Sequence, residues 1–228
     1  MNEFLLGSVF LIATIALFFV SKQIYRLFPN PFTLPIFLTS GIFVIILYVV
    51  DIPYQLYMLG GQWIDLFLGP IVVALALPLY RQLKLIKRYA RSIFIGIFAG
   101  SAVGVLSGVS GAKLLGFEQW LIQSVAAKSV TTPVALSITD TAGGNLSFAA
   151  VFVMIAGISG AMFGPSLVRI CRIEHPVARG LGIGTASHAI GTAKALELGQ
   201  LEGAVSALSM TISAVIVSFL VPFFLMFF

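Results

Sequence analysis

The sequence predicts an all-α polytopic membrane protein with about six transmembrane helices and two oppositely oriented re-entrant hairpins, arranged like an inverted-repeat transporter. Three observations lead to this prediction. The 228 residues are 59% hydrophobic and only 9% charged, whereas soluble domains carry about 25% charged residues; the mean hydropathy is +1.08. Apolar segments long enough to span about 30 Å of hydrocarbon recur along the chain. Two glycine-containing polar stretches interrupt this series.

Apolar segments expected to cross the bilayer are residues 4–20, 34–50, 64–80, 92–109, 146–168 and 203–227. We interpret the first as a retained helix, because no basic residue precedes it whereas a secretory signal begins with a basic region. One membrane domain is expected over residues 1–228. Within it, residues 1–91 hold three helices and a basic loop, and residues 92–228 hold a core of helices and hairpins.

Basic residues alternate between the loops as the positive-inside rule requires. Loop 21–33 holds Lys22 and Arg26, loop 51–63 holds no basic residue, and loop 81–91 holds a cluster of lysines and arginines. The first and third of these loops are therefore assigned to the cytoplasm, which places the N-terminus outside.

Two polar stretches, residues 119–145 and 176–200, do not fit a simple span. If the first crossed the bilayer fully, Arg169 and Arg172 would lie outside, against the charge rule. Both stretches are therefore predicted to be re-entrant, since irregular backbone at membrane depth is tolerated where protein or a water-filled cavity surrounds it. Each hairpin is followed by a helix, and the two units have opposite orientations, which is typical of inverted-repeat transporters.

The first hairpin combines a lysine, hydroxyls and a proline. A proline interrupts helical hydrogen bonding, and the N-terminus of the helix that follows presents N–H groups suited to a carboxylate. The alternative interpretation is that the lysine extends to the membrane interface and the hydroxyls bond to helix carbonyls. The candidate substrate-binding residues here are Lys128, Ser129, Thr131, Thr132 and Pro133.

The second hairpin surrounds a histidine with small residues, so that backbone and ligand can approach closely. An ionisable residue inside a membrane favours a functional role, and histidine can carry a proton near neutral pH. The alternative is a neutral histidine that hydrogen-bonds two helices. The candidate binding residues are Thr185, Ser187, His188, Gly191, Thr192 and Lys194, and the candidates for proton coupling are His188 and Asp140.

Signatures of catalysis are absent from the sequence. Two histidines and one cysteine cannot form an ordinary zinc site, and no P-loop for ATP is present. We therefore predict no enzyme, no metal and no cofactor. The net charge of +5 gathers at the ends of apolar segments, so it indicates membrane orientation and not nucleic-acid binding.

The hairpins resemble the LrgB/CidB family of bacterial membrane proteins, and the resemblance covers about residues 60 to 228. The matching stretches are Gly69-Pro70-Ile71-Val72-Val73-Ala74-Leu75-Ala76-Leu77-Pro78-Leu79-Tyr80, Lys128-Ser129-Val130-Thr131-Thr132-Pro133-Val134-Ala135, Gly184-Thr185-Ala186-Ser187-His188-Ala189-Ile190-Gly191-Thr192-Ala193 and Glu202-Gly203-Ala204-Val205-Ser206.

This resemblance implies one of two functions. The family is described as holin/antiholin-like regulators of murein hydrolase activity, and it is also similar to the C-terminal half of the plastidal glycolate/glycerate translocator. We expect a carrier for pyruvate, glycolate or glycerate; the alternative is a regulator of autolysis without carrier function. The resemblance further implies the bacterial cytoplasmic (inner) membrane and a small LrgA/CidA-like membrane partner. Besides this partner, we consider assembly as a homo-oligomer.

Overall fold

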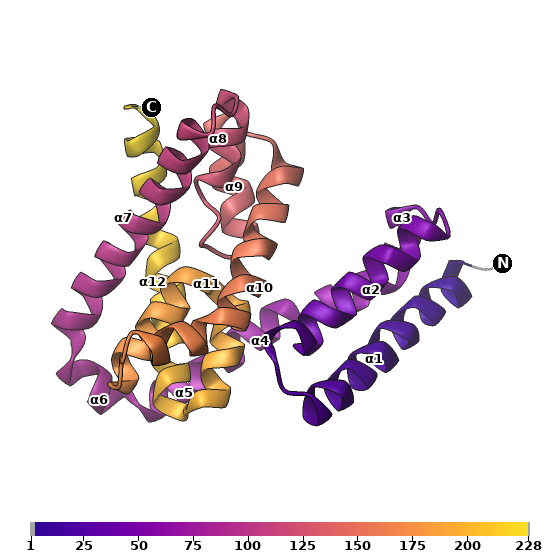
Figure 1. Cartoon of the computed structure of the whole chain (residues 1–228), viewed down its shortest axis with the longest axis horizontal. Helices are drawn as coiled ribbons and strands as arrows, with labels where there is room; N and C mark the ends of the chain where they lie inside the picture. The colour runs from indigo at the N-terminus through magenta and orange to yellow at the C-terminus, as the bar shows by residue number, and fades with distance from the viewer. Residues whose placement is uncertain (1–2, 228) are drawn as a thin grey trace. The chain divides into compact units, whose positions relative to one another are not determined.

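The computed structural model describes residues 3–227, and these residues form helices joined by short turns, with no strand among them. The chain folds as two compact units, one ending at Ala74 and the other beginning at Leu75. Four described helices are long and apolar enough to cross a membrane, namely α1 (Glu3–Leu27), α7 (Ala90–Leu114), α10 (Leu146–Ile170) and α12 (Gln200–Leu225) (Figure 1). These helices support the assignment as a multi-pass membrane protein.

The first unit contains α1, a 3₁₀ turn η1 (Pro31–Thr33), α2 (Pro35–Val49), α3 (Tyr54–Asp65) and α4 (Leu68–Ala74). Asn30 caps η1 by accepting hydrogen bonds from the backbone N–H groups of Phe32 and Thr33. Helices α1 and α3 pack closely at Gly7 and Gly60. A methyl group added to Gly60 would lie only 2.4 Å from the carbonyl oxygen of Gly7. A buried hydrogen bond of 3.0 Å from Thr39 to Ser21 joins α2 to α1.

The predicted helix over residues 64–80 is not continuous in the structure. The segment is divided among the end of α3, the short helix α4 and α5 (Ala76–Arg81), and α6 (Leu83–Arg88) follows. Pro70 and Pro78 explain the interruptions, because proline lacks the N–H group that a helix interior needs and is tolerated in a first turn. Each of the two prolines lies in the first turn of a new short helix.

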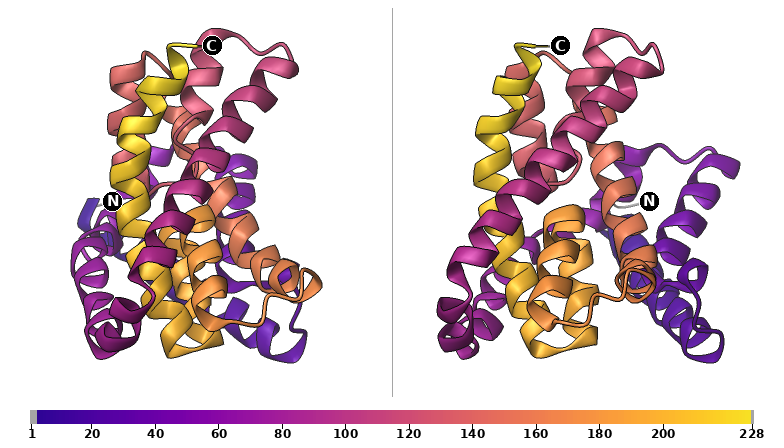
Figure 2. Two further views of the ribbon diagram at one scale, coloured as in Figure 1. Left: turned by 90° about the vertical axis from the view of Figure 1, so that its left-hand side faces the viewer. Right: turned by 60° about the vertical axis from the view of Figure 1, so that its left-hand side comes forward.

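The second unit is built on the three long helices α7, α10 and α12, with α5 against α12. Between α7 and α10 lie α8 (Gln119–Val125) and α9 (Thr132–Ala142), and between α10 and α12 lies α11 (Pro176–Leu198). Figure 2 shows α8 and α9 near the end of this unit that holds the C-terminus, with α11 at its opposite end. The two polar stretches therefore lie at opposite ends of one helical framework.

Helices α8 and α9 form a hairpin in which the last turn of α8 lies beside the residue that follows α9. The Ser124 Oγ accepts a hydrogen bond of 2.8 Å from the backbone N–H of Asn145, which follows α9. Gly143 ends α9 in the left-handed conformation at φ 79°, where a residue with a side chain is strained. The Asn145 side chain then caps α10 by accepting from Ser147 and Phe148.

Helix α11 is also a hairpin, because its chain reverses at His188, where φ is 41° and ψ is −136°. Contacts with α12 show the reversal. In the first arm, Gly180 meets Glu202 and Gly184 meets Ser206, so this arm runs in the same direction as α12. In the second arm the order is opposite, since Thr192 contacts Ser206 and Leu196 contacts Gly203.

Each hairpin has its own apolar core on the long helices. One core joins the α8–α9 hairpin to the C-terminal halves of α7 and α12, and its fully buried residues include Val105, Val130, Ala135 and Val217. The other joins the first arm of α11 to the N-terminal halves of the same two helices, with Ile93, Ile97, Val177 and Val205. Burial of these side chains, worth about 1.5–3 kcal/mol each relative to exposure, holds both hairpins in place.

Candidate functional site

The break in α11 is fixed by the side chain of His188 itself. This side chain is 4% exposed, and its Nε2 lies 3.0 Å from the Val153 carbonyl oxygen on α10, so the N–H donates to that carbonyl. Gly157 makes room for the imidazole, because a methyl group there would lie 2.7 Å from the ring. A positive φ at a residue with a side chain is strained, and such strain concentrates at functional sites.

Polar groups surround the break in α11. The Thr192 hydroxyl donates to the His188 carbonyl oxygen at 2.8 Å and lies 2.9 Å from the Ser206 Oγ on α12. The Ser187 side chain is buried against Gly160 and Gly191. Because the second arm starts after the break, its first N–H groups lack intrahelical partners and are suited to an anion.

Two predicted residues of this hairpin are engaged away from the break. The Thr185 hydroxyl donates to the Leu181 carbonyl oxygen at 2.8 Å within the first arm, and its methyl group faces Gly100 on α7. Lys194 forms an ion pair of 2.5 Å with Glu197, one turn further along the second arm. The structure therefore brings Ser187, His188, Gly191 and Thr192 together, with Lys194 held by an acidic neighbour.

The break of the first hairpin lies between α8 and α9. Ser129 is 5% exposed, and its Oγ has no hydrogen-bond partner among the residues that the structure describes. Lys128 is half-buried with its Nζ beside Gly108, and it forms no ion pair within residues 3–227. A lysine and an unpartnered hydroxyl at a buried turn provide one charge and one donor for an anion.

Helix α9 begins directly after this turn. Thr131 is its N-cap residue, but the Thr131 side chain makes no capping hydrogen bond, and Pro133 stands in the first turn without an N–H group. Thr131 and Thr132 are half-buried, whereas Pro133 is exposed. The N–H groups of the first turn of α9 therefore remain available to a ligand, with the partial positive charge of the helix N-terminus behind them.

One residue from each hairpin contacts the same part of α7. A methyl group on Gly100 would lie 3.6 Å from the Cβ of Thr185 in the second hairpin, and one on Gly104 would lie 3.8 Å from the Cβ of Ser129 in the first. Four residues of a helix correspond to about 6 Å along its axis. The predicted residues of both hairpins thus converge on one turn of α7, from opposite ends of the unit.

Asp140 lies apart from this convergence. It is exposed near the end of α9, eight positions after Thr132, which corresponds to about 12 Å along a helix. The structure thus places one proton-coupling candidate, His188, at a break and the other at the outer end of the first hairpin.

Several polar groups near the breaks were not predicted from the sequence. They are the Val153 carbonyl, which is a backbone group, and Ser101, Glu202, Ser206, Ser209 and Ser213, which are buried side chains. The spacing of the residues on α12 was a usable signal, because positions 202, 206, 209 and 213 lie on one face of a helix whose other residues are mostly apolar. No sequence pattern indicates the Val153 carbonyl.

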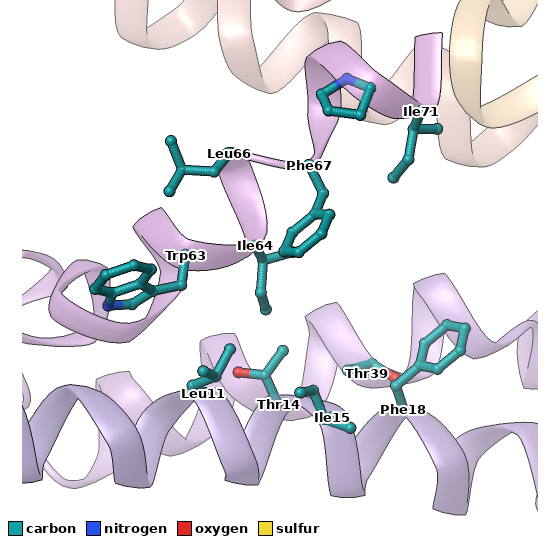
Figure 3. Close-up of a pocket in the computed structure, with 11 residues that line it drawn as sticks. Leu11, Thr14, Ile15, Phe18, Thr39, Trp63, Ile64, Leu66, Phe67 and Ile71 are labelled. Carbon is teal, nitrogen blue, oxygen red and sulfur yellow. The ribbon is translucent and has the colours of Figure 1, made fainter. Parts of the chain in front are cut away.

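A groove of about 790 Å³ lies elsewhere, in the first unit (Figure 3). Its lining is Leu11, Thr14, Ile15, Phe18, Thr39, Trp63, Ile64, Leu66, Phe67, Pro70 and Ile71. Two hydroxyls and an indole N–H are its only side-chain polar groups, and no lining residue is charged. Such a surface suits apolar chains and offers nothing to offset the desolvation of a carboxylate.

Comparisons with known proteins match nearly the whole chain. The profile of the LrgB-like family matches residues 14–227. The chain is 40% identical to YxaC of Bacillus subtilis over 222 residues, covering 97% of this chain and 96% of that protein. It is 36% and 33% identical to the proteins named holin-like protein CidB of Staphylococcus epidermidis and Staphylococcus aureus, over the full length of both chains. No solved structure matches. The chain belongs to the LrgB-like family.

Proposed function

We propose that the protein is a membrane carrier for small monocarboxylates of the pyruvate, glycolate and glycerate type. One observation carries the proposal, namely that Thr185 of the second hairpin and Ser129 of the first contact α7 one turn apart, at Gly100 and Gly104. In membrane carriers, discontinuous helices whose N-termini face a common point bind anionic groups near the bilayer midplane. In this proposal the two hairpins enter the membrane from opposite sides.

The carboxylate of the substrate binds at the break of the first hairpin. Lys128 supplies the opposite charge, and the N–H groups at the start of α9 and the Ser129 hydroxyl donate hydrogen bonds. Removing an ion from water costs several kcal/mol, and charge-assisted hydrogen bonds return about 1.5–3 kcal/mol each. Three such bonds together with Lys128 are therefore sufficient to hold the anion. Thr131 and Thr132 border the same turn.

The second hairpin contacts the other end of the substrate. Ser187 and Thr192 are the hydroxyls that recognise the oxygen on carbon 2, next to the N–H groups of the second arm. Small residues such as Gly191 let the backbone come close to the substrate, as binding of a short acid requires. Alternating movement of the two hairpins on α7 then opens the site to one side of the membrane at a time.

Coupling to a proton favours uptake of an anion into a negative interior. Moving one negative charge against the membrane potential costs about 2.3 kcal/mol per 100 mV, and a co-transported proton cancels that cost. Of the two candidates, His188 lies at the break and Asp140 does not, so we assign coupling at the break to His188. Its fixed position on Val153 keeps the imidazole at the substrate.

The membrane context follows the family. We place the protein in the bacterial cytoplasmic (inner) membrane with the N-terminus outside, beside a small LrgA/CidA-like partner, and an assembly of several copies is compatible with its apolar surface. No catalytic role is proposed.

A second candidate function is a holin-like regulator of murein hydrolase activity without transport. The relatives named holin-like protein CidB favour it, since they match over their full length. Such a role depends on assembly through apolar surfaces and has no use for a half-buried lysine and a strained histidine. The two functions therefore predict different measurements. A carrier gives selective uptake of its substrate, whereas a holin-like protein gives general leakage.

The test uses purified protein in liposomes, with and without an LrgA-type partner. Uptake of labelled pyruvate and glycolate is measured beside leakage of an encapsulated dye. We expect saturable uptake without dye release, lost in Lys128→Ala and His188→Ala. The matched controls are Lys22→Ala and Ser218→Ala, which change exposed residues of α1 and α12 and should retain uptake. Dye release without saturation, unchanged in the hairpin variants, contradicts the carrier and supports the regulator.

A further inference from the structure

Basic side chains gather on α6 and on the ends of the two helices beside it, and we call this cluster the α6 basic surface. Its members are Arg81 at the end of α5, Lys84, Lys87 and Arg88 on α6, and Arg91 in the first turn of α7. All five side chains are exposed, and none forms an ion pair with an acidic side chain in the described part of the chain. The sequence has no acidic residue from position 66 to position 117. The positive charge of this surface is therefore not neutralised locally.

The packing of α6 turns its bases away from the protein. Ile86 is 6% exposed and belongs to the apolar core that also contains Ile97 and Val177. Residues two positions before and after a given residue of a helix point to the opposite side, and beside Ile86 these residues are Lys84 and Arg88. Burial of the isoleucine therefore directs both bases toward the surroundings of the unit.

A second contact fixes α6 against the start of the second hairpin. Tyr89, the C-cap residue of α6, packs against the same core, and its ring meets that of His175 edge to face with the centroids 5.1 Å apart. His175 is the N-cap residue of α11 and accepts a hydrogen bond from the Val177 N–H. The Arg88 guanidinium lies 6.0 Å from the centre of the Tyr89 ring. The basic surface is thus positioned by packing on α11.

The place of α6 in its unit corresponds to a membrane interface. It lies at the end of the unit opposite the C-terminus, directly before the membrane-length helix α7 (Figure 1). Exposed apolar and aromatic side chains accompany the bases, namely Tyr80, Leu83 and Leu85. Tyrosine is enriched at the level of lipid headgroups, and long basic side chains extend their charge to the same level. On the expected orientation this is the cytoplasmic leaflet.

Membrane orientation alone is the simpler explanation of these bases. The positive-inside rule depends on the number of basic residues near the ends of the spans and not on how the folded protein arranges them. On α6, however, Lys84, Lys87 and Arg88 are three and four residues apart, so they share one face, and Ile86 fixes the opposite face. Clusters of four to eight bases beside a membrane helix attract anionic lipids. A fixed arrangement of such bases suits a bound phosphate.

We propose that the α6 basic surface binds the headgroups of anionic phospholipids in the leaflet at this end of the unit. Lys84, Lys87 and Arg88 hold the phosphate, and Leu83 and Leu85 contact the first part of the acyl chains. Each base near an anionic lipid surface raises affinity by about fivefold. The proposal is independent of the carrier function, because it involves no residue of the two breaks.

Native mass spectrometry of the full chain in detergent tests this binding. The probes are dioctanoyl phosphatidylglycerol and dioctanoyl phosphatidylcholine, which share acyl chains and a phosphate but differ in net charge. We expect the first to bind about 25-fold more tightly or better, as two or three bases at one headgroup predict. The double variant Lys87→Gln with Arg88→Gln should retain a preference of about fivefold or less. Lys87→Arg with Arg88→Lys keeps the charge and should retain the full preference.

The matched control is Lys22→Gln with Arg26→Gln, which removes two exposed bases from the end of α1 and should leave the preference unchanged. Equal losses in the two glutamine variants overturn the proposal, because binding then follows net charge and not this surface. Equal affinity of the unmodified protein for both lipids also overturns it. Displacement of phosphatidylglycerol by glycerol phosphate at a similar concentration indicates a site for free phosphate esters and likewise overturns the lipid assignment. These measurements need no transport, so the carrier function can fail without affecting them.

Discussion

The His188 imidazole Nε2 donates a hydrogen bond of 3.0 Å to the carbonyl oxygen of Val153. This bond joins the tip of the second hairpin to the N-terminal half of α10. Val153 also belongs to the apolar core that holds the first hairpin. A single residue of α10 therefore belongs to the core of the first hairpin and accepts the hydrogen bond that holds the strained residue of the second.

The strain at His188 predicts an unusual order of stability among its variants. Replacement by alanine keeps the cost of a positive φ, about 1–3 kcal/mol, and loses the hydrogen bond. Replacement by glycine loses the same bond but relieves the strain. We expect His188→Gly to be more stable than His188→Ala by about 1 kcal/mol, measured by thermal unfolding in detergent. The opposite order contradicts the reversal at this residue. Both variants should lack uptake.

The close approach of α11 to α12 predicts opposite effects at two neighbouring glycines. A methyl group on Gly180 would lie 2.4 Å from the Glu202 carbonyl oxygen, whereas nothing lies within 4 Å of one on Gly182. Gly180→Ala should therefore reduce stability by about 1–3 kcal/mol through overpacking. Gly182→Ala should raise it by up to about 1 kcal/mol, because alanine favours a helix. Thermal unfolding of the pair checks the register of the first arm.

The unpartnered hydroxyl of Ser129 predicts a conflict between stability and binding. Removing a buried hydroxyl that has no partner removes its desolvation penalty, so Ser129→Ala should gain about 1 kcal/mol in stability. The same variant should raise the KM for glycolate by about tenfold, the value of one charge-assisted hydrogen bond. Ser137→Ala, on the exposed face of α9, is the control and should change neither quantity. Unchanged KM in Ser129→Ala removes this residue from the site.

The contacts on α7 predict two disulfide locks. In a Cys171→Ser background, Gly104→Cys with Ser129→Cys and Gly100→Cys with Thr185→Cys place Cβ atoms 3.8 and 3.6 Å apart, close to the disulfide mean of about 3.8 Å. Each pair should form a disulfide in oxidant and lose uptake, and reductant should restore it if the hairpins move during transport. The crossed pair, Gly104→Cys with Thr185→Cys, serves as the control and should cross-link more slowly. Equal cross-linking of all three pairs argues against the arrangement on α7.

Much of this fold was predictable from patterns along the chain. Apolar segments of sufficient length predicted α1, α7, α10 and α12, because a span must satisfy its own backbone and present apolar side chains to lipid. Pro133, Gly143 and the glycines around His188 indicated where the helices are interrupted, since these residues alter local hydrogen bonding and φ. Two predicted spans differ in the structure: residues 34–50 form only the 15-residue helix α2, which is shorter than the four spans, and residues 64–80 are divided by two prolines.

The sequence by itself determined the membrane class, the family and the positions of the two interrupted polar segments, because hydropathy, turn residues and long matching motifs are local properties. Tertiary structure alone decided which of the predicted polar residues lie together. Ser129 and Thr185 both contact α7, and His188 is hydrogen-bonded to Val153. These contacts, like the burial of Glu202, depend on residues that are distant in the chain. Such contacts depend on the direction in which each hairpin returns, and that direction is set by packing on three helices at once.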